Sequence, residues 1–378
     1  MNSKLADTGT SIFTIMSKMA ADYNAINLSQ GYPGFDISME LIDLVDHYMR
    51  KGENQYAPMP GLPRLREQIT QKVNNTFDYG ADANENIIVT SGATEGIYAT
   101  ITALIHAGDE VIYFDPAYDS YHPNVRINGG TPIPIGLTFP DFSIPWEKVE
   151  VAVNENTRMI ILNTPHNPSG AVLSREDLDR LAEIIKGKDI FVLSDEVYEH
   201  LIFDGKKHHS VLSHPGLKQK SIAVFSFGKT FHATGWKMGY TVAPTKITDE
   251  IRKIHQFVVF SVNTAIQHAI TDFLKTPNHY LELPAFYQKK RDLFQSLMEK
   301  SRFKRLPSSG TYFQTYSYED ISDERDVDIA SRFTKEYGVA SIPFSVFYAE
   351  KTDNKLLRFC FAKEDETLIK ATDILCKI

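Results

Sequence analysis

Cysteine is scarce in this sequence. The 378 residues include two cysteines, Cys360 and Cys376, and contain neither a CxxC nor an HExxH spacing. Two cysteines near one end of a chain do not make a disulfide framework, and the usual spacings of a zinc site are missing. We therefore expect a protein of a reducing compartment that holds no metal ion.

Long apolar runs and basic clusters are missing as well. No stretch approaches the roughly 20 apolar residues of a membrane-spanning helix, and the first residues lack the apolar core of a secretory signal. The net charge is −8 without a basic tail, which argues against nucleic acid as the main partner. These absences predict a soluble, cytoplasmic protein that binds neither membranes nor nucleic acids.

What is present is an ordinary globular composition. Hydrophobic residues make up 42% and charged residues 23% of the chain, and the length suffices for two domains. Short apolar runs alternate with helix-like segments over residues 86–245, and a long helical region is predicted over residues 247–274. The alternation predicts an α/β fold with an open, mostly parallel sheet and helices on both faces.

Residues 221–240, SIAVFSFGKTFHATGWKMGY, are the most informative stretch. The apolar run 222–225 indicates a buried strand, and Lys229 follows where it ends. Desolvation there would lower the pKa of the amine and free its lone pair to form a Schiff base with an aldehyde. Ser226 and Lys237 together could hold a phosphate beside it. A glycine-rich turn with two solvated lysines explains the same residues equally well.

Other candidate residues also follow predicted strands. They are Gly92, Tyr118, Asn167 and Asp195, after strands predicted at 86–90, 110–114, 157–162 and 190–194. Because ligands of open α/β sheets bind beyond the carboxyl ends of the strands, one crevice could collect these residues with Lys229.

Each of these candidates also has a plainer explanation. Asparagine before proline is common turn chemistry, Tyr118 suits a surface aromatic, and Asp195 suits a helix N-cap. An acid at the end of an apolar strand is nevertheless costly to bury without a positive partner. A protonated pyridine nitrogen would be such a partner for Asp195.

The lysine segment and the loop NTPHNPSG, residues 163–170, resemble motifs of class I pyridoxal-phosphate aminotransferases. The similarity is closest to the branch of methionine aminotransferases and kynurenine–glutamine transaminases, and it extends over essentially the whole chain. It implies the fold-type I architecture. A large cofactor-binding domain is expected over residues 40–280, with a small α/β domain built from residues 1–39 and 281–378.

The resemblance implies a role for each candidate at a site for pyridoxal 5′-phosphate. Lys229 would hold the cofactor, Asp195 would face its pyridine nitrogen, and Asn167 would bind its phenolic oxygen. Tyr118 would lie against the ring, and Tyr198 would join the catalytic and cofactor-binding residues. The remaining cofactor ligands implied are Gly92, Ala93, Thr94, Ser226, Lys237 and, from a neighbouring subunit, Tyr56.

Substrate binding is implied for residues at both ends of the chain. They are Gly31, Tyr32, Asn167, Phe260 and Arg358. Gly31 would approach the substrate carboxylate through its backbone, which requires a residue without a side chain. Arg358 interrupts an apolar strand and would fork onto the α-carboxylate.

Three positions depart from the pattern of the family. His166 replaces a more usual asparagine, His232 a small residue and Lys237 an arginine found in many members. Lysine keeps the positive charge at position 237 but loses the fork geometry of arginine.

The activity implied is transfer of an amino group from an amino acid to a 2-oxo acid by a homodimer. Tyr56 and Phe260 match positions that the family shares across the subunit interface. Tyr32, Tyr118 and Phe260 predict an aromatic pocket for methionine, phenylalanine and tyrosine, with kynurenine and glutamine as further candidate donors.

Three other arginines are not expected to reach a distal substrate carboxylate. Arg126 lies beyond the Tyr118 region, and Arg252 and Arg291 fall on helices whose polar faces should be solvated. Two alternatives to the aminotransferase remain open. One is a cysteine-conjugate carbon–sulfur β-lyase, and the other is a non-catalytic regulator that binds the cofactor.

Overall fold

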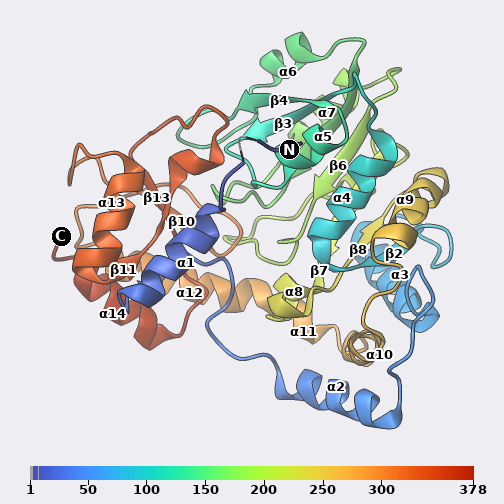
Figure 1. Ribbon diagram of the computed structural model, residues 1–378, viewed down its shortest axis with the longest axis horizontal. Coiled ribbons are helices and arrows are strands. Elements are labelled where there is room, and N and C mark those ends of the chain that lie inside the picture. The colour runs from blue at the N-terminus through green and yellow to red at the C-terminus, as the bar shows by residue number, and fades with distance from the viewer. Residues whose placement is uncertain (1–2, 7) are drawn as a thin grey trace.

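A seven-stranded sheet forms the centre of the larger part of the molecule (Figure 1). The structure is a computed structural model and describes residues 3–6 and 8–378. The strand order is β2-β8-β7-β6-β5-β3-β4, and β8 runs antiparallel to both of its neighbours. The other paired strands are parallel, as the sequence predicts. The strands are β2 (Ile87–Thr90), β3 (Glu110–Asp115), β4 (Thr131–Gly136), β5 (Thr157–Asn163), β6 (Phe191–Asp195), β7 (Ser221–Ser226) and β8 (Gly239–Val242).

Both faces of this sheet are covered by helices. Val111 and Tyr113 of β3 belong to one buried cluster with helices α4, α5 and α9, whereas Ile112 and Phe114 belong to another with α3 and α7. Because successive side chains of a strand point to opposite faces, the two clusters lie on opposite sides of the sheet. The helices are α3 (Pro63–Phe77), α4 (Gly92–Leu104), α5 (Tyr121–Ile127), α7 (Arg175–Ile184) and α9 (Thr245–Val258).

A smaller α/β part contains the C-terminal segments together with α1 (Ile12–Asp22) (Figure 1). A four-stranded antiparallel sheet has the order β12-β13-β10-β9, and β1 (Ile26–Asn27) pairs with β11 (Val339–Ala340). We propose that this part is the small domain of residues 1–39 and 281–378, of which residues 1, 2 and 7 lie outside the described ones. Its other elements are β9 (Lys304–Arg305), β10 (Phe313–Ser317), β12 (Ile342–Pro343), β13 (Leu356–Cys360), α12 (Leu283–Met298), α13 (Asp326–Arg332), α14 (Asp365–Leu375), η3 (Phe333–Tyr337) and η4 (Phe344–Phe347).

The prediction of one helical region over residues 247–274 is wrong in one respect, because two separate helices cover this range. α9 ends at Val258 and α10 (Thr264–Phe273) begins after Asn263, whose side chain accepts a hydrogen bond from the N–H of Ile266 at 3.1 Å. This N-cap satisfies a helix-end donor and starts a new helix. The remaining helices are α2 (Met39–Lys51), α6 (Trp146–Ala152), α8 (Phe227–Thr230), α11 (Asn278–Leu281), η1 (Val211–Ser213) and η2 (Thr234–Trp236).

Candidate active site

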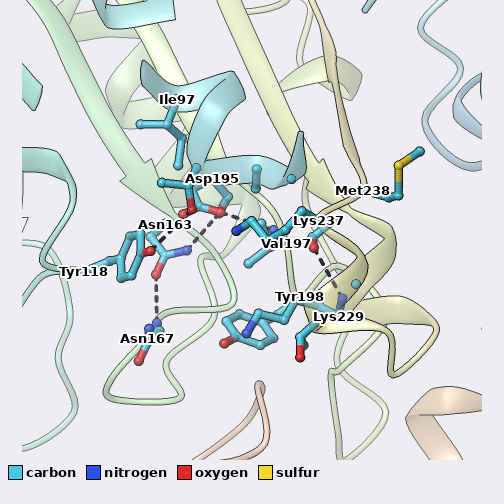
Figure 2. A pocket seen from close by; sticks show the side chains of 16 residues that line it. Ile97, Tyr118, Asn163, Asn167, Asp195, Val197, Tyr198, Lys229, Lys237 and Met238 are labelled. Atoms are coloured by element: carbon cyan, nitrogen blue, oxygen red, sulfur yellow. Dashed lines mark hydrogen bonds between the residues drawn. The ribbon is translucent and has the colours of Figure 1, made fainter. Parts of the chain in front are cut away.

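One edge of the central sheet collects most of the residues that the sequence singles out. The parallel strands β2, β5, β6 and β7 end at this edge, and β8 begins there because Ser226 pairs with Gly239 in antiparallel register. A cavity of about 180 Å³ opens at these strand ends (Figure 2). The predicted residues among those that line it are Gly92, Ala93, Thr94, Tyr118, Asn167, Asp195, Tyr198, Ser226, Lys229 and Lys237.

Lys229 occupies the short helix α8 directly after β7. The Ser226 hydroxyl caps this helix by accepting from the Lys229 backbone N–H at 3.3 Å. Its Nζ donates to the Gly31 carbonyl and to the Tyr312 hydroxyl, each at 2.9 Å. Burial lowers the pKa of the Lys229 amine to about 8. About a tenth of the amine is therefore unprotonated at pH 7, far more than for an ordinary lysine, and the unprotonated form is what a nucleophile or base requires.

Asp195 is buried at the end of β6. The Tyr121 hydroxyl donates to its Oδ2 at 2.6 Å, and the Asn163 amide donates to its carbonyl at 2.9 Å. Burial raises the pKa of Asp195 to about 6, although the hydrogen bond from Tyr121 opposes the shift. A protonated nitrogen of a bound ring would stabilise the carboxylate and reverse this shift.

The start of α4 fits a phosphate group. The first N–H groups of a helix lack intrahelical partners and carry a partial positive charge. Lys237 Nζ lies 3.3 Å from the position that a Cβ on Gly92 would take, and Ser226 lines the same cavity. A Cβ on Gly239 would come within 2.8 Å of the Ala93 nitrogen, so only glycine leaves this cradle open.

Arg358 is fully buried and directs its donors at neutral oxygens. Nη1 donates to Asn167 Oδ1 at 2.7 Å and Nη2 to the Ser29 carbonyl at 3.1 Å. The guanidinium stacks 3.8 Å from the ring centroid of Phe313. Burial lowers the pKa of Arg358 to about 10. Among the described residues no carboxylate is bonded to this buried cation, which suits an anionic ligand such as the α-carboxylate of an amino acid.

His166 joins two of the loops that carry site residues. Its Nδ1 and Ser169 Oγ are 2.7 Å apart, and the imidazole also hydrogen-bonds the backbone of Pro116. Burial lowers the pKa of His166 to about 4, so the ring is neutral at physiological pH. The departure from asparagine therefore ties the Asn167 loop to the segment that leads to Tyr118.

His232 stands where the family has a small residue, and its environment differs from that of His166. Its ring packs edge-on against Phe35 at 4.7 Å and Tyr287 at 5.7 Å between centroids. Burial lowers the pKa of His232 to about 4. The imidazole thus acts as an aromatic ring between the N-terminal loop and α12.

Five predicted residues are not among those that line this cavity: Gly31, Tyr32, Tyr56, Phe260 and Arg358. Tyr56 and Phe260 contact each other at 5.3 Å between ring centroids, and their exposed fractions are 83% and 44%. Tyr32 is also exposed, with Lys363 Nζ 4.7 Å above its ring. Gly31, in contrast, reaches Lys229 through its carbonyl. A Cβ on Gly31 would lie 2.8 Å from the Phe313 ring, which explains the requirement for glycine.

The expectation for Arg291 is wrong, because its side chain is buried instead of solvated. Both terminal nitrogens pair with the Asp204 carboxylate at 2.6 Å, and Nη2 also reaches Asp292 at 2.7 Å. Arg252 pairs with Asp249 at 3.0 Å. These carboxylates already balance the two guanidinium charges, so a distal substrate carboxylate would have to compete with them.

Three residues of the site were not predicted from the sequence. Asn163 begins the NTPHNPSG motif and accepts from the Asn167 N–H at 2.8 Å, so that motif could have indicated it. Tyr121 and Tyr312 reach Asp195 and Lys229 from distant segments, and no local pattern marks them. Only the tertiary structure reveals them.

In the described part of the chain, no group of three or more histidine, cysteine, aspartate or glutamate side chains is arranged to hold a metal ion. No helix within residues 3–6 and 8–378 combines the length and apolar character needed to cross a membrane. Cys360 and Cys376 are both free thiols.

Known proteins resemble this chain in sequence. Residues 23–375 match the family described as aminotransferase class I and II. A methionine aminotransferase from Escherichia coli is 50% identical over 374 residues, covering 99% of this chain and 97% of that protein. A kynurenine–oxoglutarate transaminase from Dictyostelium discoideum is 35% identical over 410 residues, covering 98% and 94%.

Solved structures agree with the sequence comparison. The crystal structure of a methionine aminotransferase from Escherichia coli matches with a TM-score of 0.98 at 49% identity, covering 100% of this chain and 99% of that one. An N-succinyldiaminopimelate aminotransferase from Mycobacterium tuberculosis matches with a TM-score of 0.96 at 33% identity, covering 100% and 99%. The chain therefore belongs to the class I and II aminotransferase family, whose members generally depend on pyridoxal phosphate, and it is an aminotransferase with the fold-type I architecture.

Proposed function

We propose that this aminotransferase binds pyridoxal 5′-phosphate in the cavity at the sheet edge and that Lys229 holds it. The observation that carries this proposal is the desolvated Lys229 amine in one cavity with the buried carboxylate of Asp195. The bound cofactor supplies an electron sink for negative charge on the substrate α-carbon. Tyr118, Asn167 and the cradle at the start of α4 complete the proposed cofactor site.

We assign the remaining steps of the reaction to residues of this chain. Arg358 and Asn167 bind the α-carboxylate of the amino acid and orient its Cα–H bond. The Lys229 amine would take the α-proton of the bound amino acid and later return a proton. The Asp195 carboxylate would keep a proton on a ring nitrogen of the cofactor.

Methionine and aromatic amino acids are the proposed donors, with glutamine and kynurenine as further candidates and a 2-oxo acid as acceptor. Tyr118 lines the cavity proposed for the cofactor, and Tyr32 and Phe260 lie outside it as exposed aromatic rings that could contact the donor side chain. Each methylene buried against these rings would contribute about 0.8 kcal/mol. Two relatives act on methionine and on kynurenine by their names, which supports the same classes here.

A homodimer is the proposed active unit. Tyr56 lies outside the cavity of its own chain, and it packs on Phe260 at the exposed end of α9. Phe257 nearby in sequence is 85% exposed, so an apolar surface is available to a second copy. In a twofold dimer each copy would supply its Tyr56 to the partner's phosphate site.

Borohydride trapping tests the assignment of Lys229. The purified protein should absorb near ~420 nm, and reduction should fix the cofactor on the peptide that contains Lys229. Lys229→Ala should lose the trapped cofactor, whereas the control Lys207→Ala, at an exposed position outside the cavity, should keep it. Trapping on another lysine in Lys229→Ala would overturn the assignment.

A donor panel at fixed acceptor tests specificity. Methionine, phenylalanine and tyrosine should exceed aspartate in kcat/KM. Aspartate as the best donor would show that a cation reaches the pocket. Release of pyruvate and ammonia from a cysteine conjugate without an acceptor would favour the β-lyase.

Sedimentation and mixing experiments test the dimer. Active enzyme should sediment as a dimer, and mixing Tyr56→Phe with Lys229→Ala subunits should restore one intact site in each mixed dimer. An active monomer would refute the shared site.

A further inference from the structure

The Lys229 amine has two defined hydrogen-bond partners that no role assigned above explains. Its Nζ donates to the Gly31 carbonyl and to the Tyr312 hydroxyl at 2.9 Å each, and the Tyr312 hydroxyl itself donates to the Gly31 carbonyl. The three groups come from α8, the N-terminal loop and the segment before β10. They form a closed triangle of hydrogen bonds around the amine.

The hydroxyl of Tyr312 is an acceptor toward Lys229 and not a base. A carbonyl oxygen cannot donate, so the Tyr312 proton points to Gly31 and an oxygen lone pair faces the amine. Burial raises the pKa of Tyr312 far above its usual range. The phenol therefore keeps its proton throughout the working pH range.

The backbone fixes the position of this hydroxyl. Thr311 adopts φ +66°, which is rare for a β-branched residue, and its N–H donates to the Leu201 carbonyl at 2.9 Å. A Cβ on Gly310 would lie 2.6 Å from Pro165 in the loop that carries Asn167. Strained backbone of this kind concentrates at functional sites. Tyr312 is thus anchored to the loops that form the site.

We propose that Tyr312 is a positioning residue that, with the Gly31 carbonyl, holds the amine of Lys229 after substrate has displaced it. The proposal rests on the proposed function of Lys229. The amine takes the α-proton with its lone pair and becomes an ammonium with three N–H donors. Two of these donate to Tyr312 and Gly31, and the third remains to return a proton.

The same bonds connect the lysine to the N-terminal loop. While Lys229 is free, its amine bonds the Gly31 carbonyl of that loop. When Lys229 holds the cofactor, the Gly31 carbonyl keeps the bond from the Tyr312 hydroxyl.

Removing the Tyr312 hydroxyl should change the titration of Lys229. A hydrogen bond accepted from an ammonium favours the charged form, so its loss lowers the amine pKa. In Tyr312→Phe the pKa of Lys229 should fall by about one unit, the shift expected for one hydrogen bond to a charged group. The measurement is competitive acetylation of the full-length, cofactor-free chain across pH, followed by mass spectrometry of the Lys229 peptide.

Tyr287→Phe is the matched control. The Tyr287 ring lies 5.9 Å from that of Tyr312, and within the described part of the chain its buried hydroxyl has no hydrogen-bond partner. Its removal should leave the Lys229 titration unchanged. An equal shift in both variants, or none in Tyr312→Phe, would overturn the proposal.

Kinetics of the loaded enzyme give a second readout. Tyr312→Phe should lower the rate constant of the amino-acid half-reaction about tenfold with a smaller change in KM, since its hydroxyl bonds the Lys229 amine and the Gly31 carbonyl, whereas Arg358 donates to Asn167 and Ser29. An increase in KM alone would also overturn the proposal. If borohydride trapping fails at Lys229, the proposed function fails; if trapping succeeds and the titration does not shift, only the role of Tyr312 fails.

Discussion

Two buried charged regions of this molecule differ in how their charges are balanced. In the first region, Lys72 pairs with Glu199 at 2.7 Å and with the Tyr240 hydroxyl at 3.1 Å. His208 pairs with Glu196 in the same region at 2.7 Å. At the candidate active site, Lys229 and Arg358 instead donate to carbonyl, amide and hydroxyl oxygens, and Asp195 accepts from a phenol.

The difference separates a structural from a ligand-binding use of buried charge. Asp195 and Glu196 are adjacent in sequence and both are buried, yet only Glu196 has a histidine at hydrogen-bond distance. Buried charge is costly and shifts pKa values, to about 6 for Asp195 and about 8 for Lys229, and burial raises the pKa of the paired Glu199 as well. The cavity thus retains charges that a charged cofactor and substrate can balance.

The largest effect should come from Lys229. Lys229→Ala should lower kcat/KM by about 10⁴-fold, because it removes both the attachment and the base. The free energy of unfolding of the cofactor-free protein should stay the same or rise, because a desolvated amine is removed. Steady-state kinetics and urea unfolding measure the two quantities. A large loss of stability would place Lys229 with the matched charges instead.

Lys72 should show the reverse pattern. Lys72→Met leaves Glu199 buried without its cation and should lower the free energy of unfolding by about 3–5 kcal/mol. The kcat of the folded enzyme should change little, since Lys72 lies outside the cavity lining. Urea unfolding with active-site titration checks both, and the double variant with Glu199→Gln should recover part of the stability. A reduced kcat at unchanged stability would contradict the distinction between the regions.

Asp195 should affect activity and the pH dependence of stability together. Asp195→Asn should slow α-proton removal about 10²-fold, because the neutral amide no longer holds a proton on the ring nitrogen. Its folded pKa of about 6 exceeds the ordinary value of 3.8, so the folded cofactor-free protein binds the extra proton between these values. Stability is therefore lost as pH rises from about 4 to about 6.

Asp195→Asn should abolish this loss of stability with rising pH. Above pH 6, cofactor-free Asp195→Asn should exceed the wild type by about 2–3 kcal/mol in free energy of unfolding, the amount that a shift of about two pKa units represents. Urea unfolding at pH 5 and pH 7.5 measures it. Equal pH dependence in both proteins would show that the carboxylate is already balanced.

Sequence alone predicts the parts of the fold and site that local patterns encode. Apolar strands followed by small or polar residues placed Gly92, Asn167, Asp195 and Lys229 at one sheet edge, because parallel strands share the direction of their carboxyl ends. The four-residue strand β8, GYTV, escaped prediction because its glycine and threonine leave no continuous apolar run, unlike the equally short β2, IIVT. The break at Asn263 was missed although asparagine is a common N-cap.

The rest depends on contacts between distant segments. Tyr121 reaches Asp195 across 74 positions and Tyr312 reaches Lys229 across 83, and neither stands in a recognisable motif. The burial of Arg291 depends on Asp204, which is 87 positions away. Such pairings follow from the packing of the folded chain and leave no periodicity in the sequence.

His166 should give the smallest effect, with a pH dependence opposite in sign to that of Asp195. Its folded pKa of about 4 lies below the ordinary 6.5, so the unfolded chain binds the extra proton between these values. Its contribution to stability is therefore lost as pH falls from 6.5 to 4, by about 2 kcal/mol at pH 5. His166→Asn should abolish this loss because asparagine does not titrate. Its side-chain amide can still reach Ser169 or Pro116.

The control for His166 is His166→Leu, which cannot make either bond. Both variants should lose the pH dependence, but only His166→Leu should lower stability at pH 7.5, by about 1–2 kcal/mol for the polar partners left unpaired. Its KM for the amino acid should also rise a few-fold, because the Asn167 loop is no longer tied to the segment before Tyr118. Unfolding at pH 5 and pH 7.5 together with KM distinguishes the two effects. Retained pH dependence in His166→Leu would assign it to another group and leave His166 as a packing residue between the two loops.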